Sequence, residues 1–375
     1  MNKLIAKILT CVIPFKQKRK QVRKFLMDFS FLEFFQSIIY AFIILYNKKY
    51  HATHYLIELN PFHTECMYSV FHVLPENIKK SIIILTRKEN IELKLFPQYV
   101  KTKTIYPYTI KLLDKFNFFE KKSIFVNSYL VWEQQKTIEY YFKNFIKNNK
   151  LYCIDHNPEP YSHLKINQNI KKFVLADFLS IRFNHPSFYA CFFPENENIE
   201  NTNKKFISIG FIRDQSRRDM DTYFHTLETN PNMFSYIVGT TTTKYVSKLN
   251  TLNNINYLGR ASFPDMFKAL QQSVFLPFLI HDKTLGYYQQ AISGNLNLIL
   301  GFALIPIIDE RLAKLYNLPP EACILYRGVS GFENACKDAL KLTETEIRQK
   351  RICVQRLKLE LSNKNKLALQ HFIKF

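Results

Sequence analysis

Short apolar runs alternate with longer mixed segments along the first half of the chain. Five of these runs are apolar on both faces, as buried strands are, and they cover 55–60, 81–86, 123–128, 151–156 and 172–177. The segments between them, such as 64–74 and 137–147, are compatible with helices. Strands that alternate with helices predict βαβ units around a parallel sheet.

The pattern stops and then restarts near residue 200. Residues 193–205 are polar and rich in Asn, without an apolar period, which is typical of a linker. Six further apolar runs follow at 206–212, 234–239, 255–260, 274–279, 304–309 and 322–327. Ahead of one intervening helix, Ser262 is placed to cap and Pro264 suits the first turn.

The predicted fold class is therefore α/β, with two doubly wound, Rossmann-like domains. A chain of 375 residues also exceeds the ~100–200 residues of one typical domain. We expect the domains at 49–195 and 204–345, followed by a basic terminal helix at 346–375. Two such domains face each other across a cleft, where the carboxyl ends of their strands bind ligands.

Residues 1–48 form a basic and apolar helical lead-in. Its run "KQKRKQVRK", residues 16–24, follows an apolar stretch without a small-residue cleavage site, which argues against a secretion signal. The next apolar stretch, 29–46, is interrupted by Glu33 and Gln36 and falls short of the ~20 residues that span a bilayer. Two alternatives remain: contact with an anionic membrane surface, or an ordinary first helix packed on the protein.

The formal net charge of +21 favours anionic partners, namely phosphates, nucleic acid or a membrane surface. No known nucleic-acid module is visible, and the densest basic cluster lies in the lead-in, so nucleic acid is not an expected partner. The seven cysteines are odd in number and lack any CxxC pair, which favours a reducing compartment over a disulfide framework or a zinc site.

Groups suited to phosphate follow the strands of the second predicted domain. They are Arg213, Arg217 and Arg218 after Gly210, Lys244 after Gly239, Arg260 after Gly259, and the turn Ser293-Gly294-Asn295 before a helix. Arginine binds phosphate oxygens in a bidentate manner, and a turn into a helix presents free N–H groups to an anion. Each feature alone is weak, but their recurrence at successive strand ends predicts a pyrophosphate site.

Several other chemistries lack support in the sequence. Neither a GxxxxGK[ST] loop nor a GxGxxG after the first strand is present, which disfavours NTP hydrolysis and nicotinamide chemistry. Asp219 and Asp221 form a DxD pattern, but at a predicted helix start such carboxylates are better explained as helix-cap charges. We therefore predict no essential metal and no cofactor.

Candidate acid–base residues lie at strand ends of the first predicted domain. His63 and Glu65 follow the first strand, and His156 follows the strand at 151–156, so all three face the expected cleft. A base there can take a proton from an acceptor hydroxyl. The structural alternatives are a helix-start charge for Glu65 and a hydrogen-bonded structural histidine for His156.

The second half of the chain resembles the nucleotide-sugar domain of bacterial GT-B-fold glycosyltransferases, especially those of lipopolysaccharide, lipooligosaccharide or capsule assembly. The resemblance rests on "FISIGFIRDQSRRDMDTYF", "FSYIVG", "INYLGRASFPDMFKALQQS", "YYQQAISGNLNLILGFALIPIID" and "FENACKDAL", with "IPFKQKRKQVRKFL" and "FVNSYLVW" as weaker matches in the first half. It covers roughly residues 50–345.

The resemblance implies transfer of a sugar from a nucleoside-diphosphate donor to a glycan or glycolipid acceptor on the cytoplasmic side of the membrane. By this resemblance Arg213 and Arg218 neutralise the leaving diphosphate, Gly259 and Arg260 border the nucleoside, and Ser293-Gly294-Asn295 turns at the phosphates. One departure is Asn297, which stands where many retaining members have a Glu of a glutamate pair. That departure supports the alternative of a catalytically silent GT-B-like binding or scaffold protein.

Overall fold

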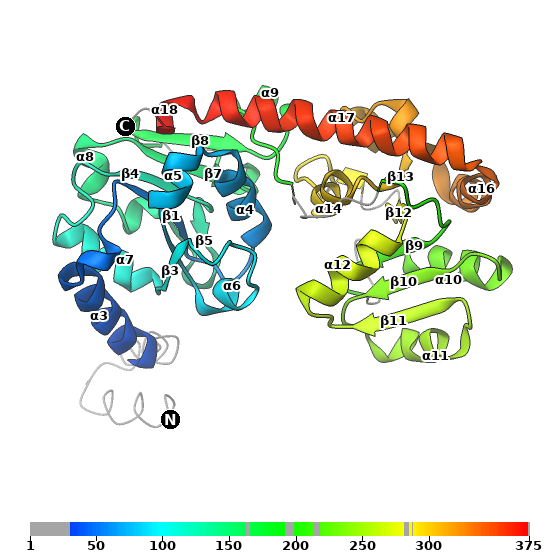
Figure 1. Cartoon of the computed structure of the whole chain (residues 1–375), viewed down its shortest axis with the longest axis horizontal. Helices are drawn as coiled ribbons and strands as arrows, with labels where there is room; N and C mark the ends of the chain where they lie inside the picture. Colours follow the sequence, from blue (N-terminus) through cyan, green and yellow to red (C-terminus); the bar gives the residue numbers. More distant parts are fainter. Residues whose placement is uncertain are drawn as a thin grey trace, which may run out of the picture.

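The computed structural model describes residues 31–162, 166–191, 199–212, 218–280, 285–286 and 288–373. Most of the lead-in, 1–30, lies outside the described residues, and so do the predicted phosphate ligand Arg213 and its neighbour Arg217. Two α/β units follow one another along the chain and are linked by a long C-terminal helix (Figure 1).

The first unit is built on a six-stranded, fully parallel sheet with strand order β3-β2-β1-β4-β7-β8. Its strands are β1 (His54–Glu58), β2 (Ile83–Thr86), β3 (Lys101–Thr104), β4 (Ser123–Val126), β7 (Leu151–Asp155) and β8 (Ile170–Val174). Its helices are α4 (Thr64–Val73), α5 (Glu76–Ser81), α6 (Lys88–Glu92), α7 (Pro107–Lys115), α8 (Phe145–Asn148) and α9 (Asp177–Phe183). These strands confirm the five that the sequence predicts. Their side chains are apolar on both faces because helices cover both faces of the sheet.

Strand β3 was not predicted from the sequence. Its residues, KTKT, are polar and partly exposed, since β3 lies at the edge of the sheet and pairs only with β2 within the described residues. The helix expected at 137–147 is also wrong. The segment instead contains a 3-10 turn at Ile138–Tyr140, and α8 begins at 145 because the Asp114 carboxylate accepts the N–H groups of Asn144 and Phe145.

The second unit repeats the same topology with strand order β11-β10-β9-β12-β13-β14. Its strands are β9 (Phe206–Ile209), β10 (Ser235–Val238), β11 (Ile255–Gly259), β12 (Phe275–Pro277), β13 (Ile305–Asp309) and β14 (Ile324–Tyr326). Its helices include α10 (Met220–Thr229), α11 (Thr243–Thr251), α12 (Phe263–Gln272), α14 (Asn295–Phe302), α15 (Glu310–Leu315) and α16 (Gly328–Lys341). The predicted cap of α12 is confirmed, since Ser262 accepts the N–H of Asp265.

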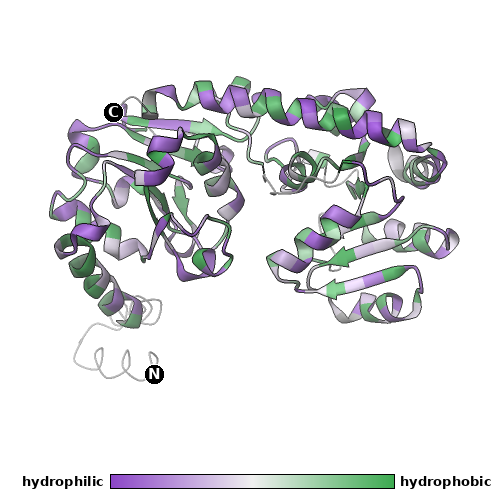
Figure 2. Ribbon diagram, in the orientation of Figure 1, coloured by the Kyte–Doolittle hydropathy of each residue, from purple (hydrophilic) through white to green (hydrophobic). Residues whose placement is uncertain are grey.

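The C-terminal helix α17 (Glu344–Ala368) runs across both units, and α18 (Gln370–Ile373) ends on the first (Figure 1). Leu369 and Phe372 belong to the apolar core of the first unit, where the ring of Phe372 contacts Phe125 and Tyr152. Apolar strands and mixed helix surfaces are distinguishable in Figure 2, where α17 alternates between the two colours along its length. The C-terminal end of the chain therefore packs against the first unit.

Helix α3 (Phe31–Tyr46) is the described part of the lead-in and lies at the lower end of the first unit in Figure 1. One face packs on the protein, with Ser37, Ala41 and Ile44 buried. Among the described residues, no helix combines the length and the apolar character needed to cross a bilayer.

Candidate functional site

The two sheets reverse their strand order between β1 and β4 and between β9 and β12. Ligands of doubly wound sheets bind at such switch points, beyond the carboxyl ends of the strands. The loops after β1 and β4 carry His63 and Asn127, and the loops after β9 and β12 carry Arg218 and the turn 293–295. Of the predicted residues, His63, Arg218 and the turn 293–295 therefore follow the switch points of their sheets.

A pocket of about 450 Å³ lies between the units and is lined by residues of both. Its lining includes Phe62, His63, Glu65, Cys66, Trp132, His156, Asn157 and Leu175 from the first unit, and Ala291, Ile292, Gly294 and Asn297 from the second. The three predicted acid–base residues and one predicted phosphate-turn residue thus share one cavity. We take this pocket as the candidate active site.

His63 and Glu65 form a pair at the start of α4. His63 precedes the helix in a left-handed conformation with φ 66°, and its Nδ1 lies 3.6 Å from Glu65 Oε1. Burial alone would lower the pKa of His63, but the hydrogen bond and charge of Glu65, together with the charge of Glu58, raise it above its ordinary value. Glu65 also lies in the first turn of α4, the position that a helix dipole favours for a carboxylate.

His156 stacks on His63 with 4.0 Å between ring centroids. Its Nε2 lies 2.8 Å from the carbonyl oxygen of Asn127, and burial and the neighbouring His63 hold its pKa well below the ordinary value. A neutral imidazole that donates from Nε2 leaves Nδ1 as an acceptor, and Cys66 Sγ is 4.0 Å from it. His156 is thus a hydrogen-bonded histidine, as the structural alternative expects, and its predicted acid–base role stays a prediction.

A buried carboxylate beneath His63 was missed by the sequence analysis. Glu58 ends β1 with 0% exposure, and its oxygens accept from Asn60 N and Nδ2, Asn127 Nδ2 and Ser128 Oγ at 2.5–3.1 Å. Burial raises the pKa of Glu58, and these donors oppose the rise. Asn127 Nδ2 also donates to the carbonyl of His63 at 2.9 Å, so the network fixes the loop that presents the imidazole. The sequence offered one signal for Glu58, which is a polar residue at the end of an otherwise apolar strand.

Arg218 lies at the corresponding edge of the second sheet. Its guanidinium donates to the carbonyl of Ile209 at the end of β9 and reaches Asn295 Oδ1 at 3.4 Å. Asn295 begins α14 after the N-cap Gly294, and its backbone N–H donates to Ser293 Oγ at 3.3 Å. The structure thus brings together Arg218, Ser293, Gly294 and Asn295, and the phosphate role of this group stays a prediction.

Two glycines make room for this arrangement. Gly210 and Gly239 end β9 and β10 with φ values of 128° and 143°, which side chains rarely adopt. A Cβ on Gly210 would lie 2.5 Å from Arg218 Nη2, and one on Gly239 would clash with the carbonyl oxygen of Gly210. Glycine is therefore required for the loop backbones to approach each other and the guanidinium.

Lys244 and the nucleoside-binding candidates lie elsewhere on the second sheet. Lys244, on α11, pairs with Asp221 Oδ2 at 3.0 Å, while Arg260 is exposed beyond Gly259 at the end of the edge strand β11. Their predicted roles remain predictions. Asp219 is the N-cap of α10 and accepts from Thr222, so the assignment of both aspartates as helix-start charges is confirmed. Within the described residues, no three His, Cys, Asp or Glu side chains gather as a metal site.

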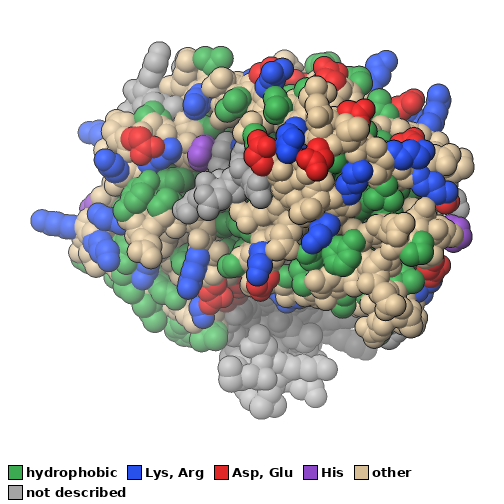
Figure 3. Space-filling view, turned by 45° about the vertical axis from the view of Figure 1, so that its right-hand side comes forward, with side chains coloured by type: hydrophobic (Ala, Val, Ile, Leu, Met, Phe, Trp, Pro, Cys, Tyr) green, Lys and Arg blue, Asp and Glu red, His purple; other side chains and the backbone are tan. Residues whose placement is uncertain are grey.

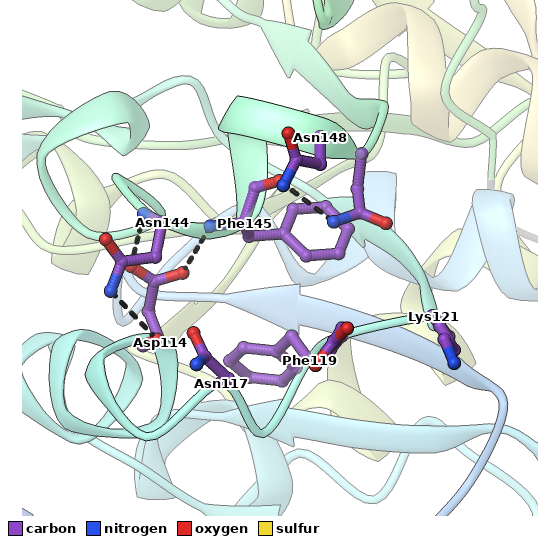
Figure 4. A pocket seen from close by; sticks show the side chains of 9 residues that line it. Asp114, Asn117, Phe119, Lys121, Asn144, Phe145 and Asn148 are labelled. Carbon is purple, nitrogen blue, oxygen red and sulfur yellow. Dashed lines mark hydrogen bonds between the residues drawn. The ribbon is translucent and has the colours of Figure 1, made fainter.

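A second pocket of about 250 Å³ lies away from the cleft, where α7 and α8 lead back to the starts of β4 and β7. Figure 4 shows the Asp114 carboxylate accepting the N–H groups of Asn144 and Phe145, both at 2.8 Å. Because ligands of such sheets bind at the carboxyl ends of the strands, we assign Asp114 a structural role. On the face drawn in Figure 3, Lys and Arg are dispersed among acidic side chains.

No protein-family model matches this sequence, and no curated protein matches it. Solved structures share its fold over most of their length. HepE from Anabaena in complex with UDP-glucose has a TM-score of 0.58 at 11% identity, over 86% of this chain and 100% of that one.

Two other structures have a TM-score of 0.54 over 86% of this chain. The UDP-forming alpha,alpha-trehalose-phosphate synthase from Burkholderia vietnamiensis is 9% identical and covered over 96%. The N-terminal domain of trehalose-6-phosphate phosphatase from Candida albicans is 11% identical and covered over 97%. Identities this low establish the fold alone, and the predicted architecture of two facing parallel α/β domains, the GT-B fold, is confirmed.

Proposed function

We propose that this protein is a glycosyltransferase that moves a sugar from a nucleoside-diphosphate donor to a glycan or glycolipid acceptor. The observation that carries the proposal is the pocket between the units, where His63 and Glu65 line one side and the start of α14 lines the other. A base on one wall and an anion-binding helix start on the opposite wall are the two parts that such a transfer requires. Neighbours of the same fold include complexes with UDP and UDP-glucose.

In this mechanism the neutral His63 takes the proton of an acceptor hydroxyl. The hydroxyl oxygen forms a bond to the anomeric carbon of the donor, while the bond from that carbon to the diphosphate oxygen breaks and both its electrons leave with the diphosphate. Glu65, with Nδ1 of His63 3.6 Å away, stabilises the imidazolium that forms. The N–H groups at the start of α14, with Arg218 beside Asn295, stabilise the departing charge.

The first experiment is a screen of UDP-, GDP-, ADP- and CMP-sugars for stabilisation of the purified protein, followed by assays of donor hydrolysis and transfer. We expect one donor class to raise the melting temperature and to be turned over. Arg218→Ala should abolish transfer, whereas Arg348→Ala, at a half-exposed position on α17, should retain it. Wild-type turnover by Arg218→Ala, with the variant folded, contradicts the assignment of this loop. If no donor shifts melting and none is turned over, the enzyme proposal fails.

A binding or scaffold protein of the same fold is the second candidate. The observation that favours it is Asn297, a neutral side chain that lines the pocket where many retaining transferases have a glutamate. This candidate predicts nucleoside-diphosphate binding without hydrolysis or transfer of any donor sugar. The same screen therefore separates the two functions.

We also propose that the protein works in cell-surface polysaccharide assembly, on the inner face of the cytoplasmic membrane. Helix α3 carries five large apolar side chains, each more than half exposed, at heptad spacing: Leu32, Phe35, Ile39, Phe42 and Tyr46. The run 16–24 just ahead of α3 carries six basic residues in nine. An apolar helix face next to a polybasic segment suits an anionic lipid surface.

Vesicle flotation tests this membrane contact. Full-length protein should float with vesicles that contain phosphatidylglycerol and far less with pure phosphatidylcholine, and added salt should weaken the binding. Replacing Phe35 and Phe42 by Ser should abolish flotation without lowering donor binding. A dimer in solution that these two substitutions dissociate, with no flotation of the wild type, identifies the apolar face of α3 as a contact between copies instead.

A further inference from the structure

Two exposed aromatic rings stand on the first unit's wall of the candidate active site. Trp132 is 42% exposed and Phe62 is 38% exposed, and both line the pocket that contains His63. The ring of Phe62 meets that of His63 edge to face, with 4.7 Å between centroids. Aromatic rings of this size are usually buried, so their exposure beside the candidate base points to a ligand that covers them.

The backbone of Trp132 is fixed from below. It lies in the short connection between β5 (Leu130–Val131) and β6 (Lys136–Thr137), and its N–H donates to Asn60 Oδ1 at 2.9 Å. Asn60 is itself fully buried and donates to Glu58 Oε1, the carboxylate whose network also fixes the His63 loop. One buried network therefore holds both the loop of the candidate base and the backbone of Trp132, as a binding surface requires.

We propose that Trp132 and Phe62 bind the sugar ring of the acceptor, and this inference rests on the glycosyltransferase function proposed above. The C–H groups on one face of a pyranose are weakly positive and apolar, and they pack on the negative face of an aromatic ring. Both aromatic residues belong to the first unit, whereas the helix start that suits the donor diphosphate belongs to the second. A sugar held on these rings lies in the same pocket as His63, which takes the hydroxyl proton.

The charge beside Trp132 narrows the class of acceptor. Glu133 follows the indole directly and lies 3.1 Å from the buried Arg87, which also contacts Glu33 at 3.4 Å and Glu89 at 3.8 Å. Among the described residues that line the pocket itself, Glu65 is acidic and none is Lys or Arg, in a chain whose overall charge is +21. The acceptor sugar at this position is therefore uncharged rather than phosphorylated or carboxylated.

Trp132 is the single tryptophan of the chain, so fluorescence excited at a wavelength that the 22 tyrosines do not absorb reports on this position alone. Titration with methyl β-galactoside should change the indole emission in a saturable manner, while galactose 6-phosphate should do so much more weakly. UDP alone should leave the emission unchanged. In transfer assays, Trp132→Ala should raise the acceptor KM about tenfold at an unchanged donor KM, and Trp132→Phe should restore most of that loss. Tyr99→Ala, which removes an aromatic ring that is 53% exposed and does not line this pocket, serves as the control.

The outcomes separate this inference from the proposed function. If nucleotide-sugars stabilise the protein and are turned over while the glycoside leaves the emission unchanged, the acceptor assignment is wrong and the function stands. If UDP itself changes the emission, Trp132 belongs to the nucleotide site and the acceptor assignment is again wrong. Failure of both the glycoside and all donor sugars overturns the inference together with the function on which it rests.

Discussion

The buried Arg351 on α17 should contribute strongly to the stability of the fold. Its side chain is 1% exposed and donates from Nε to Ala303 O at 3.0 Å, from Nη1 to Asn201 O at 2.7 Å and from Nη2 to Phe302 O at 3.1 Å. Two of these carbonyls end α14, where a helix favours a positive charge. Burial lowers the pKa of Arg351 to about 10, so the side chain is still charged at neutral pH.

The substitution Arg351→Met keeps the apolar stem and removes all three donors. Each buried carbonyl left without a donor costs ~1–3 kcal/mol, and the desolvation of the guanidinium that is no longer required offsets part of the total. We therefore expect a loss of about 3–5 kcal/mol, a large share of the ~5–15 kcal/mol of a typical domain. Because α14 begins at the pocket, binding of the donor should weaken as well.

Urea unfolding measured by far-ultraviolet circular dichroism tests this value, with Arg348→Met as the matched control. Arg348 lies on the same helix but is only half-buried, with 43% of its side chain exposed, and it pairs with Glu200 and Glu344. Its loss should cost less than ~1 kcal/mol. If Arg351→Met is no less stable than Arg348→Met, the carbonyl contacts do not hold α17 to the second unit and the reasoning is refuted.

Three further predictions concern charges. Glu65→Gln should move the acidic limb of the pH profile of kcat/KM to lower pH, because Glu65 raises the pKa of His63. His63→Gln should remove that limb and lower the activity ~10²–10⁴-fold. If the limb does not move in Glu65→Gln, His63 is not the base. Asp219→Ala should cost ~1 kcal/mol in urea unfolding through the lost cap of α10, and activity that is unaffected by added divalent cations or by a chelator, in this variant as in the wild type, would agree with a cap rather than a metal ligand. Burial and nearby lysines lower the pKa of His72 from 6.5 to about 4. The neutral side chain therefore stabilises the fold above pH 6.5, and this contribution is lost as the pH falls toward 4; partial exposure of the side chain limits it to ~1–2 kcal/mol. In His72→Gln the midpoint of urea unfolding should depend less on pH over this range.

The strands were predictable because their burial is recorded in their own residues. A strand covered on both faces, such as β2 or β13, must be apolar at most positions, and the sequence shows this directly. The edge strand β3 lacks that constraint, and its KTKT sequence matches a loop as well as a strand. The helix expected at 137–147 failed for a different reason, since Asp114 from a distant helix starts α8 at a new position.

The candidate site was predictable only as a set of strand-end residues. Parallel strands bring their carboxyl ends to one edge, which is why His63, Glu65 and His156 share one pocket. The sequence left the roles of His63 and His156 equivalent, whereas the structure gives His156 a carbonyl partner and a lowered pKa. In the sequence Glu58 is only one residue of a predicted strand. The four hydrogen bonds that its carboxylate accepts in the structure show that it holds the loop of His63.

The sequence by itself determined the fold class, the two α/β repeats and the strand ends at which chemistry is placed, because these depend on local patterns of burial. Tertiary structure alone decided how α17 ties the two units together and which side chains meet in the pocket. The buried side of α17 contains Arg351, Lys358 and Asn365, a pattern that in sequence is the same as an exposed polar face. Their partners are backbone groups 48 to 176 residues away, so no local pattern can reveal them.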